Sequence, residues 1–421
     1  MDTLESFLNF AEQSPTAFHA AHNLKEMLRQ AGFRELKEKD PWLLDDGGKY
    51  FVARNDSSVI AFAIPRSGFS TFRIAAAHTD SPMFRLKPRF EDISEGAYLR
   101  LNVEKYGGAI LSTWLDRPLS VAGRLVVREG NGTAIRLANL DRDAALIPNM
   151  PIHFNREVNE GYKWNVQTDL MPLFGGEKDA GRLMAELAES AGVRPEDVLA
   201  HDLFLYSRQP GCVWGAGDAF FSCGRIDDLE CAWGCMKALT ASEAREAIQV
   251  CAVFDNEEVG SRTRQGADST FLRDTLTRAG FALGASDWEI RAAMADGFMV
   301  SADNAHALHP NHPEKYDRQN RVFMNGGVVI KHNANQKYTT DAVSDARFTL
   351  ICEKAGVPVQ HFANRSDIPG GSTLGNISNA HVSMSTVDIG LAQLAMHSAC
   401  ETAGTKDPDY LIRAMEAFWS E

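Results

Sequence analysis

Long apolar runs and a basic leader are absent from this chain. No stretch of the sequence approaches the roughly 18 apolar residues needed to cross a bilayer. The first residues, MDTLE, are acidic, whereas a signal peptide begins with a basic segment and continues into an apolar one. We therefore expect a cytoplasmic protein without a membrane partner.

An excess of positive charge is missing as well. The 421 residues include 43 Lys and Arg against 56 Asp and Glu, which gives a formal net charge of -13. Proteins that bind nucleic acids need basic surface to displace phosphate counterions, and no basic stripe is present. We expect no nucleic-acid partner.

Two kinds of site also find no support in the sequence. The seven cysteines are odd in number and show no Cys-x-x-Cys spacing, so they predict neither a disulfide framework nor a cysteine zinc site. No serine lies in a Gly-x-Ser-x-Gly elbow, which disfavours a serine hydrolase.

The pattern of predicted secondary structure changes twice along the chain. Helical spacing from Ser14 to Gly32 precedes short strands expected over 50–53, 58–64 and 72–77. Between about residues 88 and 218 the pattern is β-rich. Strands are expected there over 98–103, 119–127 and 133–137, with one helix over 180–190.

Strands and helices alternate from residue 220 onward. Helices are expected over 229–240, 267–279, 340–355 and 390–403, and strands over 249–254, 298–302, 327–331 and 382–387. This alternation predicts an α/β fold, an open sheet flanked by helices on both faces, with an inserted β-rich domain. The predicted boundaries are 1–88 and 219–421 for the α/β domain and 89–218 for the insertion.

Two adjacent carboxylates, Glu257 and Glu258, follow the apolar stretch 250–254. At a strand's exit such a pair can divide its roles, one residue binding a metal ion while the other takes a proton from the attacking water. An isolated Glu-Glu pair is more often a solvated turn. This pair is not isolated, because His78 and Asp303 also end apolar runs. In open α/β sheets ligands collect at such strand ends.

Imidazole and carboxylate groups are zinc ligands, and Mn²⁺ or Co²⁺ can take the same groups. Two metals about 3.5–4 Å apart need a bridging carboxylate, for which Asp227 of the Asp227-Asp228 pair is the candidate. Asp80 is expected to accept a proton from the second ring nitrogen of His78. Taken singly, these residues are more often a structural histidine, a helix N-cap or a turn cap. Their conjunction favours a metal site.

Several motifs resemble those of the aspartyl aminopeptidases, a cytosolic group of dinuclear zinc exopeptidases, and the chain looks like a bacterial member. The resemblance covers nearly the whole length and is carried by residues 77–82 (AHTDSP), 224–228 (GRIDD), 255–261 (DNEEVGS), 301–311 (SADNAHALHPN) and 394–398 (LAMHS). It implies a zinc-exopeptidase-like catalytic domain, an inserted domain for oligomerisation and substrate access, and a homo-oligomer in the form of a dodecamer.

The resemblance also assigns roles to residues. It implies two zinc ions per subunit, one held by His78 and Asp303, the other by Glu258 and His397, with Asp227 bridging and Glu257 as general base. His397 lies in a predicted helix, where a histidine is more often packed or exposed, so His381 competes with it as the last ligand.

Three further residues are expected at the substrate. Lys331 aligns with a family lysine near an acidic substrate side chain; the alternative is a surface lysine on a strand. His153 aligns with a histidine of the insertion that reaches a neighbouring subunit's active site, and His306 with a residue of the substrate pocket.

The predicted function is removal of an N-terminal residue, Asp or Glu, from peptides. Another zinc exopeptidase or deacylase with the same metal core is an alternative, as is a non-catalytic assembly stabilised by metal.

Overall fold

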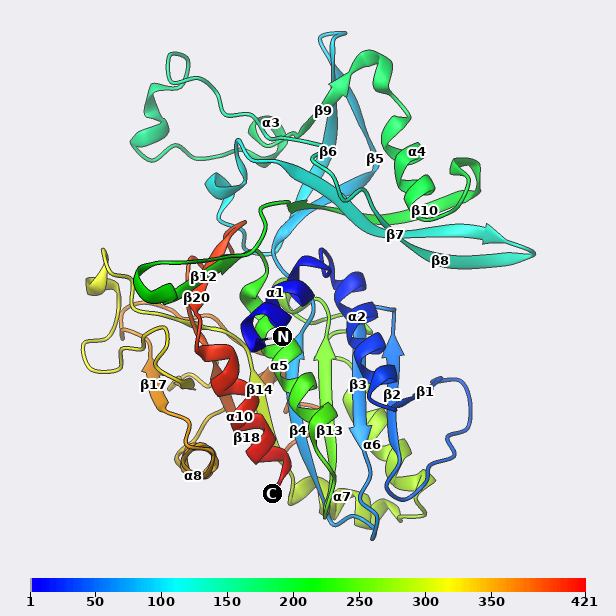
Figure 1. The fold of residues 1–421 in the computed structure, drawn as a ribbon, viewed down its shortest axis with the longest axis vertical. Helices are drawn as coiled ribbons and strands as arrows, with labels where there is room; N and C mark the ends of the chain where they lie inside the picture. The colour runs from blue at the N-terminus through cyan, green and yellow to red at the C-terminus, as the bar shows by residue number, and fades with distance from the viewer. Residues whose placement is uncertain (1) are drawn as a thin grey trace. The chain divides into compact units, whose positions relative to one another are not determined.

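The largest sheet has nine strands in the order β1-β2-β3-β13-β4-β14-β18-β16-β17 (Figure 1). The structure, a computed structural model, describes residues 2–421. The strands of this sheet are β1 (Arg34–Leu36), β2 (Lys49–Arg54), β3 (Ser58–Ala63), β4 (Thr71–His78), β13 (Ala247–Phe254), β14 (Phe298–Ala302), β16 (Val328–His332), β17 (Val359–Ala363) and β18 (Ser385–Gly390).

Helices cover both faces of this sheet because its strands bury side chains on both. Along β4, Ala75 and Ala77 join one apolar cluster, whereas Ile74 and Ala76 join the other. The first cluster is closed by α1 (Thr3–Glu12), α2 (Ala17–Gln30), α5 (Ile226–Ala241), α8 (Ala342–Ala355) and α10 (Asp407–Trp419). The second is closed by α6 (Phe271–Ala282), α7 (Asp287–Ala295) and α9 (Leu374–Ser378). The predicted open mixed sheet with flanking helices is confirmed.

A smaller five-stranded sheet corrects one expectation. Its order is β11-β12-β20-β19-β15, with β11 (Cys212–Trp214), β12 (Phe220–Cys223), β15 (Ala305–His306), β19 (Ala392–Leu394) and β20 (Glu401–Gly404). The predicted helix over 390–403 is therefore wrong. Strands β19 and β20 pair antiparallel there, and the φ angles of 55° at Ala395 and 69° at His397 are incompatible with a right-handed helix. The strand expected over 382–387 is also displaced, because β18 begins at Ser385.

The insertion contains a six-stranded antiparallel sheet in the order β8-β7-β10-β5-β6-β9. Its elements are β5 (Met83–Ser94), β6 (Tyr98–Tyr106), β7 (Leu119–Glu129), β8 (Gly132–Asn139), α3 (Val166–Asp169), β9 (Leu173–Gly176), α4 (Arg182–Ser190) and β10 (Val198–Ser207). Leu183 and Leu187 of α4 pack in an apolar cluster with residues of the sheet such as Val121 and Leu203. This core is separate from the clusters of the nine-stranded sheet.

Chain contacts divide the protein into two compact units. The first comprises Met1–Asp80, Gly211–Met396 and Glu401–Glu421, and the second comprises Ser81–Pro210 with His397–Cys400. A role of the second unit in oligomerisation and substrate access stays a prediction. Among residues 2–421, no helix combines the length and the apolar character required to cross a membrane.

Gly390 ends β18 at a point where the backbone approaches closely. A Cβ atom at this position would lie 2.0 Å from the carbonyl oxygen of Asp303, far inside any permitted contact. Because the obstructing atom is backbone, no rotamer change relieves it. We expect Gly390→Ala to lower the free energy of unfolding by about 1–3 kcal/mol, measured by denaturant titration.

Gly371→Ala is the matched control, since no atom lies within 4 Å of a Cβ built there. Equal unfolding midpoints for the two variants would contradict the close approach of β18 to Asp303.

Candidate metal centre and active site

Three neighbouring strands deliver the predicted residues to one edge of the nine-stranded sheet. β4 runs parallel to both β13 and β14, so the carboxyl ends of all three meet. His78 is the last residue of β4 and pairs in register with Phe254 of β13. Glu257 and Glu258 follow on a short 3-10 helix, and Asp303 follows β14. Segments far apart in sequence are thus brought together by sheet order.

A buried group of ligand atoms forms at this edge. His78, Asp227, Asp228 and Asp303 each offer one atom, and these atoms all lie within 4.8 Å of one another. The Nε2 atom of His78 is 3.7 Å from Oδ1 of Asp227. All four residues are at most 8% exposed. The structure therefore brings three predicted ligands together and adds Asp228, which sequence reasoning treated only as the partner of Asp227.

The start of α5 explains how both aspartates reach the group. Asp227 and Asp228 have non-helical φ/ψ angles and are joined by a cis peptide bond. The backbone N–H of Asp227 donates to Oε2 of Glu401 over 3.1 Å, and Oδ2 of Asp228 accepts from the backbone N–H of His78 over 3.1 Å. Glu401 is a positioning residue that the sequence did not reveal, because its partner lies 174 positions away.

Asp80 connects the histidine to the glutamate pair. Its Oδ1 and Oδ2 atoms accept from the backbone N–H groups of Glu257 over 3.1 Å and Glu258 over 3.2 Å. The Nδ1 atom of His78 lies 3.4 Å from Oδ1 of Asp80. The backbone oxygen of Asp80 is nearer to Nδ1, at 3.0 Å. The carboxylate predicted to orient the histidine thus also fixes both glutamates.

Crowded acidic groups at this edge disfavour ionisation. Burial raises the pKa of Glu257 to about 8, although His78 opposes the shift. Burial and the charge of Asp227 raise the pKa of Glu258 well above its usual value, and burial does the same for Asp228. Such a group is stable only with compensating positive charge.

The donor set fits divalent cations. It combines one imidazole with several carboxylates, the ligands that zinc and similar metals accept, and burial keeps competing water away. His78, Asp227, Asp303 and Glu258 are therefore able to hold metal at this edge of the sheet.

Lys331 is buried beside this group, so the alternative of a surface lysine is wrong. Its side chain is 2% exposed, and its Nζ donates to the backbone oxygen of Asp303 over 2.8 Å. Nζ also lies 3.6 Å from Oδ1 of Asp303 and 5.1 Å from the centre of the Tyr338 ring. Burial lowers the pKa of Lys331, but Asp303, Tyr338 and Asp388 together outweigh it and raise the pKa above its usual value.

The remaining candidate histidines each have neighbours within their own unit. His306 is half-buried on β15, with its ring edge-on to Phe362 at 6.2 Å. His381 pairs with Asp268 over 2.9 Å, and no metal-ligand group of residues 2–421 includes it. His397 belongs to the second unit, where its Nδ1 lies 3.3 Å from the backbone oxygen of Gly108.

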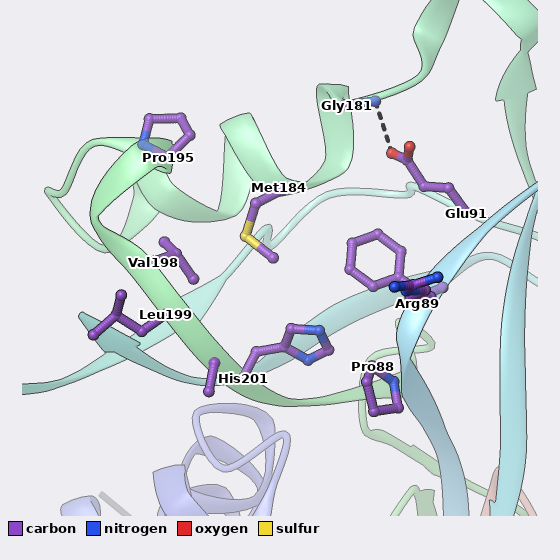
Figure 2. A pocket seen from close by; sticks show the side chains of 11 residues that line it. Pro88, Arg89, Glu91, Gly181, Met184, Pro195, Val198, Leu199 and His201 are labelled. Atoms are coloured by element: carbon purple, nitrogen blue, oxygen red, sulfur yellow. Dashed lines mark hydrogen bonds between the residues drawn. The ribbon is translucent and has the colours of Figure 1, made fainter. Parts of the chain in front are cut away.

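Two of the cavities formed by the described residues lie in the second unit. Exposed His153 lines one of about 750 Å³ together with Trp164 and Asp169. The other, of about 400 Å³, lies between β5, β10 and α4, where the His201 ring stands edge-on to Phe90 (Figure 2). No predicted site residue lines the smaller cavity.

Comparison with known proteins decides the class of this site. Residues 10–419 match the family model described as aminopeptidase I zinc metalloprotease (M18). The chain belongs to the M18 family. The predicted resemblance is confirmed, and the M18 assignment makes the protein a zinc metallopeptidase hydrolase of the aminopeptidase class.

Similar proteins match this chain over almost its whole length. A probable M18 family aminopeptidase 2 of Clostridium acetobutylicum is 45% identical over 429 residues, covering 100% of this chain and 99% of the relative. Ape4, solved in complex with Nbr1, is 37% identical with a TM-score of 0.96, covering 99% of this chain and 85% of that chain. The mApe1 dodecamer of S. cerevisiae is 27% identical with a TM-score of 0.88, covering 100% and 97%.

Asp80 offers a test of how the glutamate pair is positioned. Asp80→Asn keeps the size of the side chain but replaces one acceptor oxygen with an NH2 group. This NH2 group cannot accept a hydrogen bond from the backbone N–H that it faces. Loss of such an outer hydrogen bond typically costs about 10–100-fold in activity or metal affinity. We expect a decrease of that size in kcat, measured on a peptide substrate with zinc content determined in parallel.

Asp45→Asn, at a carboxylate that is 74% exposed, controls for the loss of a charge alone. Wild-type kcat and zinc content in Asp80→Asn would rule out this positioning role.

Proposed function

We propose that this M18 enzyme removes an N-terminal acidic residue from peptides through two zinc ions in each subunit. The observation that carries the proposal is the buried group of His78, Asp227 and Asp303 beside the Glu257-Glu258 pair. A single imidazole among several buried carboxylates suits divalent metal, and one of the two glutamates is left for proton transfer.

The ligands divide between two positions in this proposal. His78 and Asp303 hold one ion, Glu258 and His397 hold the other, and Asp227 bridges them. His381 is set aside because its ring pairs with Asp268. When bound, zinc supplies Lewis-acid polarisation of the scissile carbonyl and lowers the pKa of water. Mn²⁺ or Co²⁺ suits the same ligands.

Glu257 acts as the general base. Its backbone N–H is fixed by Asp80, and its side chain is within electrostatic reach of His78 and Asp303. It takes a proton from the attacking water and returns that proton to the leaving amine. Glu258, the next residue, instead serves as a metal ligand.

Glu257→Gln separates proton transfer from metal binding. The amide is nearly the same size as the carboxylate but cannot accept the proton, so kcat should fall at least about 100-fold, the lower range for general-base catalysis. Zinc content, measured by elemental analysis, should equal that of the wild type. Activity retained by Glu257→Gln would remove Glu257 from the mechanism.

Acetylation of the substrate distinguishes an aminopeptidase from a carboxypeptidase or deacylase with the same metal core. An enzyme that binds the free amine should cleave an unblocked peptide and leave its N-acetylated form intact. Preferential cleavage of the acetylated form would favour the deacylase.

Chelation addresses the alternative of a metal-stabilised assembly without catalysis. Peptide hydrolysis should disappear on removal of metal and return with zinc. A chain that is inactive in both states would support the structural role.

Lys331 is the proposed determinant of acidic specificity, because it places a buried cation beside Asp303. A hydrogen bond to a charged group contributes about 1.5–3 kcal/mol, or about 10–100-fold in kcat/KM. Lys331→Met should lower the preference for N-terminal Asp over Ala by this factor in a substrate panel. An equal loss for both substrates would show that Lys331 acts only by holding Asp303.

Other parts of the proposal concern the assembly. We propose that the chain forms a dodecamer, as the similar mApe1 does, and works in the cytoplasm. His153 would then extend from the insertion to a neighbouring subunit's active site and stabilise the oxyanion. His306 would contact the bound peptide.

A further inference from the structure

Two histidines and an aspartate of the first unit form a second group of ligand atoms. His332 ends β16, His361 lies on β17, and Asp345 lies in the first turns of α8. The structure brings one ligand atom of each within 4.8 Å of the others. We propose that this group is a peripheral site for a divalent transition metal such as zinc, separate from the peptidase centre.

The distances suit a metal ion with little rearrangement. The Nε2 atom of His332 is 2.8 Å from Oδ2 of Asp345, and the Nε2 atom of His361 is 3.1 Å from Oδ1. Zinc bonds of about 2.0–2.1 Å in a tetrahedron place ligand atoms about 3.3 Å apart. Small side-chain rotations therefore convert the present contacts into coordination by Nε2 of each neutral ring, which then carries its proton on Nδ1.

Strand register explains why the histidines share one face. β16 and β17 are parallel, with Ile330 opposite His361, so Ile330, His332 and His361 point to the same side of the sheet. Helix α8 covers that side, because its Phe348 packs in the same apolar cluster as Ile330. Lys331, between Ile330 and His332, points to the opposite side, toward Tyr338 and Asp303.

The surroundings are those of an accessible metal site. Two imidazoles and a carboxylate are a common zinc ligand set and leave a position for water. Thr349 Oγ1 donates to Oδ1 of Asp345 over 3.1 Å, the kind of outer hydrogen bond that orients a ligating carboxylate. Side-chain exposure is 35% for His332, 18% for Asp345 and 45% for His361, so metal can enter from solution.

The site has a structural consequence for the edge of the sheet. β17 is the last strand of the nine, bonded on one side to β16. A metal held by His361, His332 and Asp345 would tie this edge strand to its neighbour and to α8. Metal that binds only the folded state stabilises it, so added zinc should raise the unfolding temperature.

Zinc titration of the holoenzyme tests the proposal. Enzyme with a filled peptidase centre should take up one further zinc per chain by calorimetry, and crystals should show an anomalous zinc peak between the three side chains. His361→Ala and Asp345→Asn should lose this equivalent and the zinc-dependent rise in unfolding temperature, while keeping the zinc of the peptidase centre and wild-type circular dichroism.

His312→Ala is the matched control, because half-buried His309 and exposed His312 form another close pair of histidines, with ring centres 5.1 Å apart. This variant should bind the additional zinc normally. Absence of the further equivalent in the wild type, or its retention in His361→Ala, would overturn the proposal. Zinc uptake is measured independently of peptide hydrolysis. An enzyme without peptidase activity would therefore contradict the proposed function but not the proposed peripheral site.

Discussion

Repulsion among buried carboxylates is the constraint on which the site depends. Asp227, Asp228 and Asp303 meet in a space where water does not screen them, and Glu257 and Glu258 lie beside them. The side chains that offset this negative charge are His78 and Lys331. Divalent metal resolves the imbalance, and the same ions activate water and carbonyl in a peptidase.

Positioning contacts turn this electrostatic cluster into a defined geometry. Asp80 holds the backbone of both glutamates, and Glu401 holds the backbone of Asp227. Lys331 holds Asp303 from the far side through the backbone oxygen. Each contact joins segments distant in sequence, so the ligand arrangement depends on the whole α/β unit. The peripheral His332 group shares β16 with Lys331 but lies on the other face.

Strand ends were predictable because an apolar run that stops at a polar residue marks the edge of a parallel sheet. His78, Glu257 and Asp303 were found in this way, and the strands that carry them are present. Other features carry no such local signal. The burial of Lys331 depends on Asp303, 28 positions earlier. Strands β19 and β20 form because they pair with each other and because β20 pairs with β12. Strand β5 escaped prediction because Pro88 and an irregular register interrupt it.

We propose that Asp227 joins two zinc ions at the exit of β4. Anomalous diffraction at the zinc edge, with crystals of the wild type and of Asp227→Asn, measures this directly. We expect two neighbouring peaks at His78, Asp227, Glu258 and Asp303 in the wild type, and weak or absent density at both positions in Asp227→Asn. A single wild-type peak at this centre, or two full peaks there in the variant, would contradict the proposal.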